Sequence, residues 1–218
     1  GRRKKDQDPA DQDVVAGAPE PDRVSEATAS AVESAATDSP AEPVDSDEGP
    51  FDIEDFDNPE EAAQARLDLG SVLIPMPAGG QVQVELSQTG VPSAIWVVTS
   101  NGRFTIAAYA APKSPGQWRE VAGELAEALR KDNASVSIQD GPWGREVVGT
   151  GAGVVRFIGV DGYRWMVRCV VNGIAESMEA LAAEAREALA DTVVRRGDTP
   201  MPVRTPLPVQ LPEQLAAQ

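Results

Sequence analysis

The pattern that most constrains the fold of this chain is a β-hairpin signal followed by an amphipathic run, and it occurs twice. Asn101-Gly102 and Asp161-Gly162 each separate two segments rich in valine and aromatic residues. These dipeptides are the strongest short-range hairpin signals, because a two-residue type I′ turn needs positive φ at both central positions. Apolar residues at helical spacing follow each hairpin. The sequence therefore predicts two hairpin–helix units.

The two units have the same internal spacing. Their turns lie 60 residues apart, and so do the paired apolar positions of the two helices, which are Trp118 and Met178, Val121 and Leu181, Leu125 and Ala185, and Leu129 and Leu189. Ancestral duplication explains this agreement, and a chance match of two generic units is the alternative. The first helix is predicted to begin at a capping box over residues 114–117, with Pro115 at its first position.

The predicted fold class is α+β. A hairpin with one helix is too small to be stable alone, so we expect both units to share one sheet. This sheet is mostly antiparallel and is formed by two β-hairpin–helix–strand repeats, with the two main helices packed on one face. In the first hairpin, Ile95 and Val97 lie opposite Trp96 and Val98, so both faces are apolar and both need cover. The helices supply one cover, and the C-terminal strap, the lead-in or another subunit supplies the other.

In the second hairpin we take Val160 and Tyr163 as the closing pair, which places Ile158 opposite Trp165. One face is then apolar apart from Arg156. The other face mixes apolar side chains with cations, and its members are Phe157, Met166, Arg164 and Arg168.

Acidic charge is concentrated near the N-terminus. Residues 1–61 contain 19 Asp and Glu against 5 Lys and Arg, so they hold −14 of the total formal charge of −16. Residues 1–50 are predicted to be a disordered acidic arm, because a segment of this composition buries too little apolar surface to fold. Its basic head, residues 2–5, either contacts nucleic acid or anionic lipid or is a solubilising end.

Three further segments are predicted after the arm. Residues 51–70 form a lead-in with a short helix that starts at Asn58-Pro59 and runs to about Leu67. This lead-in either docks on a basic partner or packs on its own domain. Residues 71–198 form the duplicated α+β domain. Residues 199–218 form a Pro-rich strap in which prolines alternate with apolar residues, so it cannot be a central strand. The strap is either a ligand for an aromatic groove or is packed on its own domain.

The residue inventory excludes several chemistries. Histidine is absent and Cys169 is the single cysteine. Disulfide scaffolds, Cys/His zinc sites and His-dependent triads are therefore excluded. Cys169 lies in a valine-rich strand and is predicted to be a buried, inert thiol. The glycines of Gly149–Val154 do not match a phosphate-binding motif and are predicted to form a flexible loop. We expect no enzymatic activity, no cofactor and no metal.

No run approaches the length of a membrane span and the first residues lack the apolar core of a signal peptide, so we expect a cytoplasmic protein. The candidate binding residues combine aromatic and cationic side chains. They are Trp143 and Arg145, together with Phe157, Met166, Arg164 and Arg168. Arginines beside aromatic residues bind anions, nucleotides or single-stranded nucleic acid. Nucleic acid is nevertheless a disfavoured partner, because the acidic arm opposes phosphate binding. The arm could instead mask these arginines.

Three stretches, DGPWGREV, VRFIGVDGYRWMVR and VVRRGDTPMPVRTPLPVQLP, resemble an uncharacterised family of actinobacterial proteins that is catalogued as a domain of unknown function. The resemblance covers Phe51–Pro212. It implies a cytosolic protein whose gene often lies near that for dUTPase, and it supplies no catalytic residues. We predict a non-catalytic protein-interaction or adaptor domain that binds a protein partner or self-associates. The alternative is an anion- or nucleotide-binding domain that uses the Arg/Trp surface, linked by the resemblance to nucleotide or genome maintenance.

Overall fold

The structure is a computed structural model that describes residues 49–212. The predictions for residues 1–48, including the basic head, and for residues 213–218 of the strap lie outside the described residues. The described chain contains, in order, β1 (Phe51–Asp52), η4 (Ile53–Asp55), α3 (Pro59–Ala63), β2 (Arg66–Asp68), β3 (Val72–Pro75), β4 (Gln81–Leu86), β5 (Pro92–Thr99), β6 (Gly102–Ala110), α4 (Gln117–Lys131), β7 (Ser135–Gly141), β8 (Gly144–Thr150), β9 (Val154–Asp161), β10 (Trp165–Gly173), η5 (Ala175–Ser177), α5 (Met178–Ala190) and β11 (Val193–Val194).

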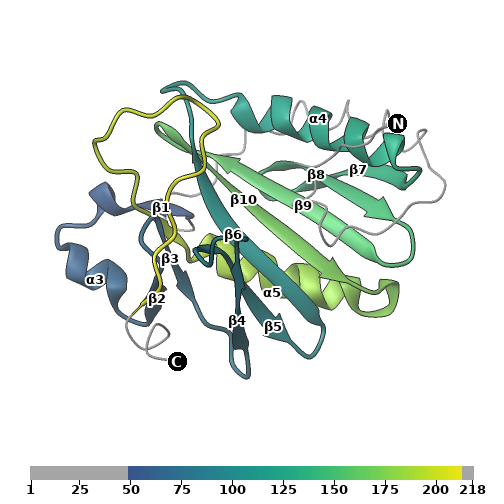
Figure 1. The fold of residues 1–218 in the computed structure, drawn as a ribbon, viewed down its shortest axis with the longest axis horizontal. Helices are drawn as coiled ribbons and strands as arrows, with labels where there is room; N and C mark the ends of the chain where they lie inside the picture. The colour runs from purple at the N-terminus through teal and green to yellow at the C-terminus, as the bar shows by residue number, and fades with distance from the viewer. Residues whose placement is uncertain (1–48, 213–218) are drawn as a thin grey trace.

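The α+β fold class is confirmed, and the main sheet is antiparallel throughout. It has seven strands in the order β4-β5-β6-β10-β9-β8-β7, so the two predicted hairpins meet at its centre through β6 and β10 (Figure 1). The two units share this sheet as expected, except that the final strand of the second unit, β11, lies in a smaller sheet of order β1-β11-β3-β2. The common spacing of the two units therefore extends over the hairpin and the helix but not over the final strand.

The two main helices lie on opposite faces of the seven-stranded sheet, so the prediction that both pack on one face is wrong. Helix α4 packs with alternate strand residues such as Val147 and Phe157, whereas α5 packs with their neighbours Val148 and Ile158. Figure 1 shows α5 behind β6 and β10. The reason lies in the strands, because a sheet that is apolar on both faces must be shielded from water on both. Each helix supplies one cover.

The β9–β10 hairpin has a longer turn than the sequence predicts. Asp161 pairs with Met166 and Ile158 pairs with Cys169, so the predicted pairing of Ile158 with Trp165 is wrong. The loop holds three residues, Gly162 to Arg164, and is closed by the Gly162 N–H donating to the Trp165 carbonyl at 2.8 Å. The partner of Ile158 moves by an even number of residues, so each side chain keeps its predicted face.

Two other local predictions need correction. In the β5–β6 hairpin Thr99 pairs with Gly102, so the turn residues are Ser100 and Asn101 rather than Asn101 and Gly102. Much of the predicted loop over Gly149–Val154 is strand, because β8 runs to Thr150 and β9 starts at Val154. Helix α3 starts at Asn58-Pro59 as predicted but ends at Ala63, before Leu67.

The Pro-rich strap packs on its own domain. Leu207 is 4 % exposed and joins the core on the α5 side of the sheet. Strand β5 pairs with β6 only as far as Thr105, and the strap replaces it beyond that point. The Leu207 N–H donates to Ala108 O and the Ala110 N–H donates to Thr205 O, both at 2.9 Å.

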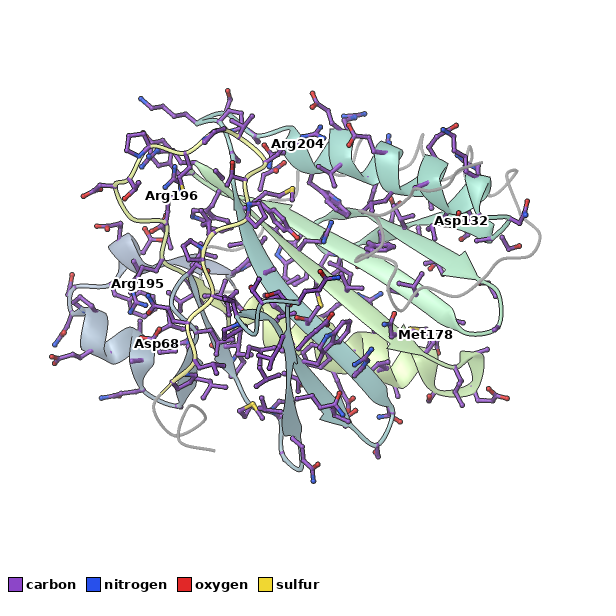
Figure 2. All side chains as sticks on the ribbon, in the orientation of Figure 1. Asp68, Asp132, Met178, Arg195, Arg196 and Arg204 are labelled. Atoms are coloured by element: carbon purple, nitrogen blue, oxygen red, sulfur yellow. The ribbon has the colours of Figure 1, made fainter. Side chains whose placement is uncertain are left out.

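The side chain of Arg204 holds the strap on α4 by ion pairs to Glu120 at 3.1 Å and Glu124 at 2.7 Å (Figure 2). At the other end of the strap region, Arg195 pairs with Asp68 at 2.8 Å. The hydrogen bond from Arg195 lowers the pKa of the Asp68 carboxyl below its usual value. Arg204 therefore attaches the strap to α4, and Arg195 attaches the segment before the strap to the smaller sheet.

A cluster of charged side chains lies on the face of the main sheet that α5 covers. Glu146 of β8 is 1 % exposed and accepts hydrogen bonds from Arg156 at 2.6 Å and from Arg186 at 2.8 and 3.0 Å. The Glu146 hydrogen bond raises the pKa of Arg186. Arg156, the one cation of the otherwise apolar hairpin face, is thereby neutralised in the interior.

Cys169 is buried, as predicted. Burial raises the pKa of its thiol well above the usual range, and the nearby Glu146 carboxylate acts in the same direction. A thiol in this state is a poor nucleophile, because the thiolate is the reactive form.

Candidate functional site

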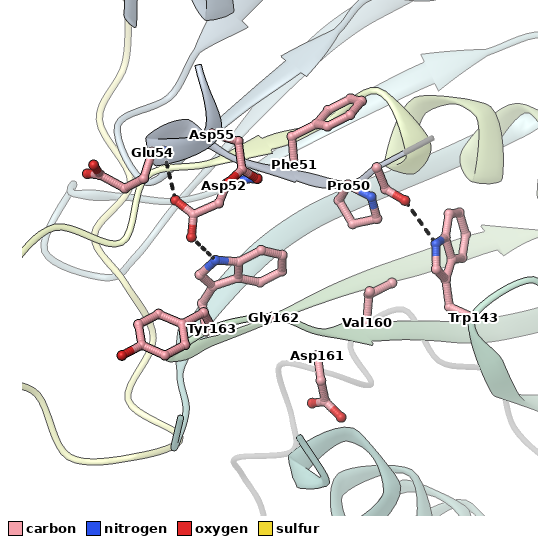
Figure 3. A pocket seen from close by; sticks show the side chains of 12 residues that line it. Pro50, Phe51, Asp52, Glu54, Asp55, Trp143, Val160, Asp161, Gly162 and Tyr163 are labelled. Atoms are coloured by element: carbon pink, nitrogen blue, oxygen red, sulfur yellow. Dashed lines mark hydrogen bonds between the residues drawn. The ribbon is translucent and has the colours of Figure 1, made fainter. Parts of the chain in front are cut away.

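A hollow lies where the lead-in crosses the ends of the β7–β8 and β9–β10 hairpins. It has a volume of about 590 Å³ and combines aromatic with acidic residues (Figure 3). We call it the aromatic–acidic slot, and its defining residues are Phe51, Trp143, Tyr163 and Trp165 with Asp52, Glu54, Asp55 and Asp161. Tyr163 is 58 % exposed, so the slot opens to solvent along one side.

Two indole N–H groups tie the walls of the slot together. Trp143 donates to the Gly49 carbonyl at 3.1 Å, and Trp165 donates to the Asp52 carboxylate at 2.9 Å. Figure 3 shows both bonds running from the hairpin ends to the lead-in. Asp52 also accepts from the Glu54 N–H at 2.9 Å, which places it at the start of η4. The slot is therefore held open by hydrogen bonds that do not depend on a bound ligand.

The four carboxylates of the slot are not equivalent. Asp52 is engaged by Trp165, and the Asp161 side chain points away from the lead-in towards α4 (Figure 3). Asp161 accepts from the N–H groups of Gly116 and Trp118, both at 3.0 Å. Glu54 and Asp55 are exposed. The negative charge available to a ligand in the slot therefore comes mainly from Glu54 and Asp55.

Asp161 caps α4 from a distant part of the chain. The helix begins at Gln117 with Gly116 as its N-cap and makes no side-chain cap bond of its own, so the predicted capping box is wrong. A carboxylate at a helix N-terminus satisfies free N–H groups and opposes the positive end of the helix dipole. The turn of the second hairpin thus replaces the local cap.

We expect Asp161→Ala to lower the free energy of unfolding by ~1–2 kcal/mol, because two N–H groups at the start of α4 lose their acceptor. Urea unfolding followed by circular dichroism measures the change. Asp161→Asn retains an acceptor oxygen and should lose less. Asp198→Ala, which removes an exposed acid outside the helices, is the matched control and should leave stability unchanged. Equal losses for Asp161→Ala and Asp198→Ala would contradict the cap.

A smaller hollow of about 290 Å³ adjoins the slot, with Trp143 and Asp161 lining both. Arg119 and Arg145 also line it. The Trp118 indole N–H donates to the Arg145 carbonyl at 2.9 Å and so fixes that part of the wall. Asp161 occupies the N-terminus of α4, which would otherwise attract an anion to this hollow.

The structure does not bring the six sequence-predicted binding residues into one site. Trp143 and Arg145 line the smaller hollow together. Phe157 and Met166 are 1 % and 2 % exposed and pack under α4, so the interpretation of their hairpin face as an accessible surface is wrong for both. Arg168 stacks over Tyr109 at 5.0 Å.

Arg164 belongs to the β9–β10 turn, where its carbonyl accepts from the Ala111 N–H at 2.9 Å and from Arg196 Nε at 3.1 Å. Burial lowers the pKa of Arg196, and the charge of Arg164 acts in the same direction. Sequence reasoning did not assign the slot residues Tyr163 and Trp165 to a site. The available signal was the acidic aromatic lead-in, for which the sequence left two roles open, docking on a basic partner or packing on its own domain.

Among residues 49–212, no group of three or more acidic or cysteine side chains is placed to hold a metal ion. No helix in the described part of the chain has the length and apolar character needed to cross a membrane.

The fold and the slot define a mixed α+β domain with a preformed aromatic–acidic pocket at one end of its main sheet. A sequence model of the family described as Protein of unknown function (DUF3710) matches residues 49–218, and the chain belongs to this family. The family resemblance noted from the sequence is thereby confirmed. No curated protein and no solved structure matches the chain.

Proposed function

We propose that the domain is a non-catalytic module that binds a protein partner, and that the aromatic–acidic slot receives a basic side chain of that partner. The observation that carries the proposal is the combination of exposed carboxylates with aromatic rings around one hollow. An arginine or lysine side chain is attracted to an aromatic face and forms charge-assisted hydrogen bonds with carboxylates. The slot therefore favours cations over the phosphates of nucleotides.

The way the slot is built supports a binding role. Trp143 and Trp165 are fixed by hydrogen bonds to the lead-in, so a ligand does not have to order them. Tyrosine and tryptophan are also the residues that contribute most strongly to protein–protein interfaces. The proposal places the module in the cytoplasm, which its single buried thiol supports. A second copy of the chain remains one candidate partner, to be tested by light scattering.

Calorimetric titration of the full chain with an Arg-Gly repeat peptide tests the slot. We expect Glu54→Lys combined with Asp55→Lys to weaken binding by roughly tenfold, which corresponds to about 1.4 kcal/mol. The control combines Glu127→Lys with Glu179→Lys, two exposed acids on α4 and α5, and so has the same net charge. Equal affinities of the two double variants would show that the peptide is bound by net charge alone and would overturn the proposal.

The second candidate function is anion or nucleotide binding at the smaller hollow, with a link to nucleotide or genome maintenance. Arg119 and Arg145 beside Trp118 and Trp143 favour it, whereas the Asp161 carboxylate opposes it. Titration with ATP and with inorganic phosphate distinguishes the two candidates. Binding of ATP that Arg119→Gln abolishes and that the Glu54 and Asp55 variant leaves intact would favour this second function.

A further inference from the structure

Part of the main sheet on the α4 side lies beyond that helix. Helix α4 contacts β7, β8 and β9, and within residues 49–212 no other helix packs on this face. The neighbouring strands β5, β6 and β10 present a row of side chains there, which we call the open sheet face. Its members are Trp96, Arg103, Ala107, Tyr109 and Arg168. The pairing of Ala107 with Arg168 and of Trp96 with Thr105 places them all on this side.

The two arginines of this face lie over aromatic rings. The Arg103 guanidinium lies 4.0 Å from the Trp96 ring centroid, and that of Arg168 lies 5.0 Å from the Tyr109 centroid. Stacking covers the face of a guanidinium and leaves its edge N–H groups for carboxylates. Arg103 donates to Gln83 at 3.3 Å, while Arg168 Nε is buried without a hydrogen-bond partner. Among the described residues neither arginine forms an ion pair.

The chain contains a segment with complementary charge. Residues 1–48 hold 13 Asp and Glu against 5 Lys and Arg. They join the domain at Gly49, which accepts the Trp143 hydrogen bond next to the β9–β10 turn. Strand β10 runs from this turn towards Arg168, and a nine-residue strand spans roughly 30 Å. A chain of 48 residues can extend to about 160 Å, so its length is sufficient to cross the whole face.

We propose that the acidic segment of residues 1–48 docks on the open sheet face of its own chain, with carboxylates on the edges of Arg103 and Arg168. This contact lies on a different surface from the aromatic–acidic slot and does not depend on it. It adds cover to a part of the α4 side that no helix of residues 49–212 covers, where Trp96 is 5 % exposed and Arg103, Ala107, Tyr109 and Arg168 are half-buried.

Photocrosslinking in the full chain tests the contact. A p-benzoylphenylalanine residue in place of Ala107 lies beside Arg168 and four residues along β6 from Arg103. One in place of Ala183, which is exposed on α5, lies on the opposite side of the sheet. We expect intrachain crosslinks from position 107 to residues 1–48 that exceed those from position 183 by roughly tenfold. Arg103→Glu with Arg168→Glu should abolish the excess. Equal yields from both positions, or products of twice the chain mass, would overturn the proposal.

A second measurement leaves the sheet unmodified. All Asp and Glu of residues 1–48 are replaced by Asn and Gln, and amide resonances of the full chain are compared with those of the unmodified protein. Among the amides of residues 49–212 we expect shifts confined to β5, β6 and β10, and we expect these differences to vanish at about 0.5 M salt because exposed charge pairs are screened. Unchanged resonances of residues 49–212 at low salt would rule the contact out, whether or not the crosslinking variants fold.

Discussion

Glu146→Ala is expected to lower the free energy of unfolding by ~3–5 kcal/mol, because it leaves the buried Arg156 guanidinium without a counter-charge. Glu146 is 1 % exposed and pairs with both arginines of the cluster, accepting from Arg156 at 2.6 Å and from Arg186 at 2.8 Å. Arg186 is partly exposed and can turn to solvent, whereas Arg156 cannot. Urea unfolding at neutral pH measures the loss.

Two variants control this result. Glu146→Gln keeps an acceptor oxygen but removes the charge, so we expect an intermediate loss. Glu127→Ala removes a carboxylate that is 65 % exposed and should change stability by no more than about 0.5 kcal/mol. A loss for Glu146→Ala as small as that for Glu127→Ala would mean that the cluster relaxes to solvent and does not stabilise the fold.

Phe157→Ala is expected to destabilise the domain by ~3–5 kcal/mol, because it leaves a cavity under α4. Phe157 is 1 % exposed and packs with Trp118 and Met166. The matched comparison is Tyr163→Ala, which removes a ring of similar size from the same hairpin where it is 58 % exposed. We expect Tyr163→Ala to cost less than about 1 kcal/mol and to weaken peptide binding in the slot.

The pair of variants separates the core from the site. Thermal unfolding and calorimetric titration of the Arg-Gly repeat peptide should show loss of stability for Phe157→Ala and loss of affinity for Tyr163→Ala. Comparable stability losses for the two variants would contradict the assignment of Phe157 to the core and of Tyr163 to the surface.

Local patterns predicted the elements of this fold better than their assembly. The two hairpins and the two helices follow from turn residues and apolar spacing, and the buried thiol follows from its valine-rich strand. The sequence also showed that Ile95 and Trp96 occupy two apolar faces. The prediction assigned both helices to one face and left the other to the strap, the lead-in or another subunit, whereas the structure places α4 and α5 on opposite sides.

The candidate site was less predictable because it is made from contacts between distant segments. Trp165 lies 113 residues from Asp52 and Trp143 lies 94 residues from Gly49, and no local pattern indicates such pairings. Asp161 was interpreted as a turn residue because Asp-Gly is a turn signal. Its second role, as the cap of α4, depends on where the hairpin ends in space.

The pairing of the strap with β6 has a consequence for biosynthesis. The last residues of the described chain supply the hydrogen-bond partners of Ala108 and Ala110, near the centre of the main sheet. During translation these backbone groups stay unpaired until the strap has left the ribosome. An open strand edge is a template for pairing with other chains. Products that stop short of residue 204 would therefore leave this part of β6 unpaired and able to pair with other chains. We expect such fragments to aggregate unless they are degraded quickly.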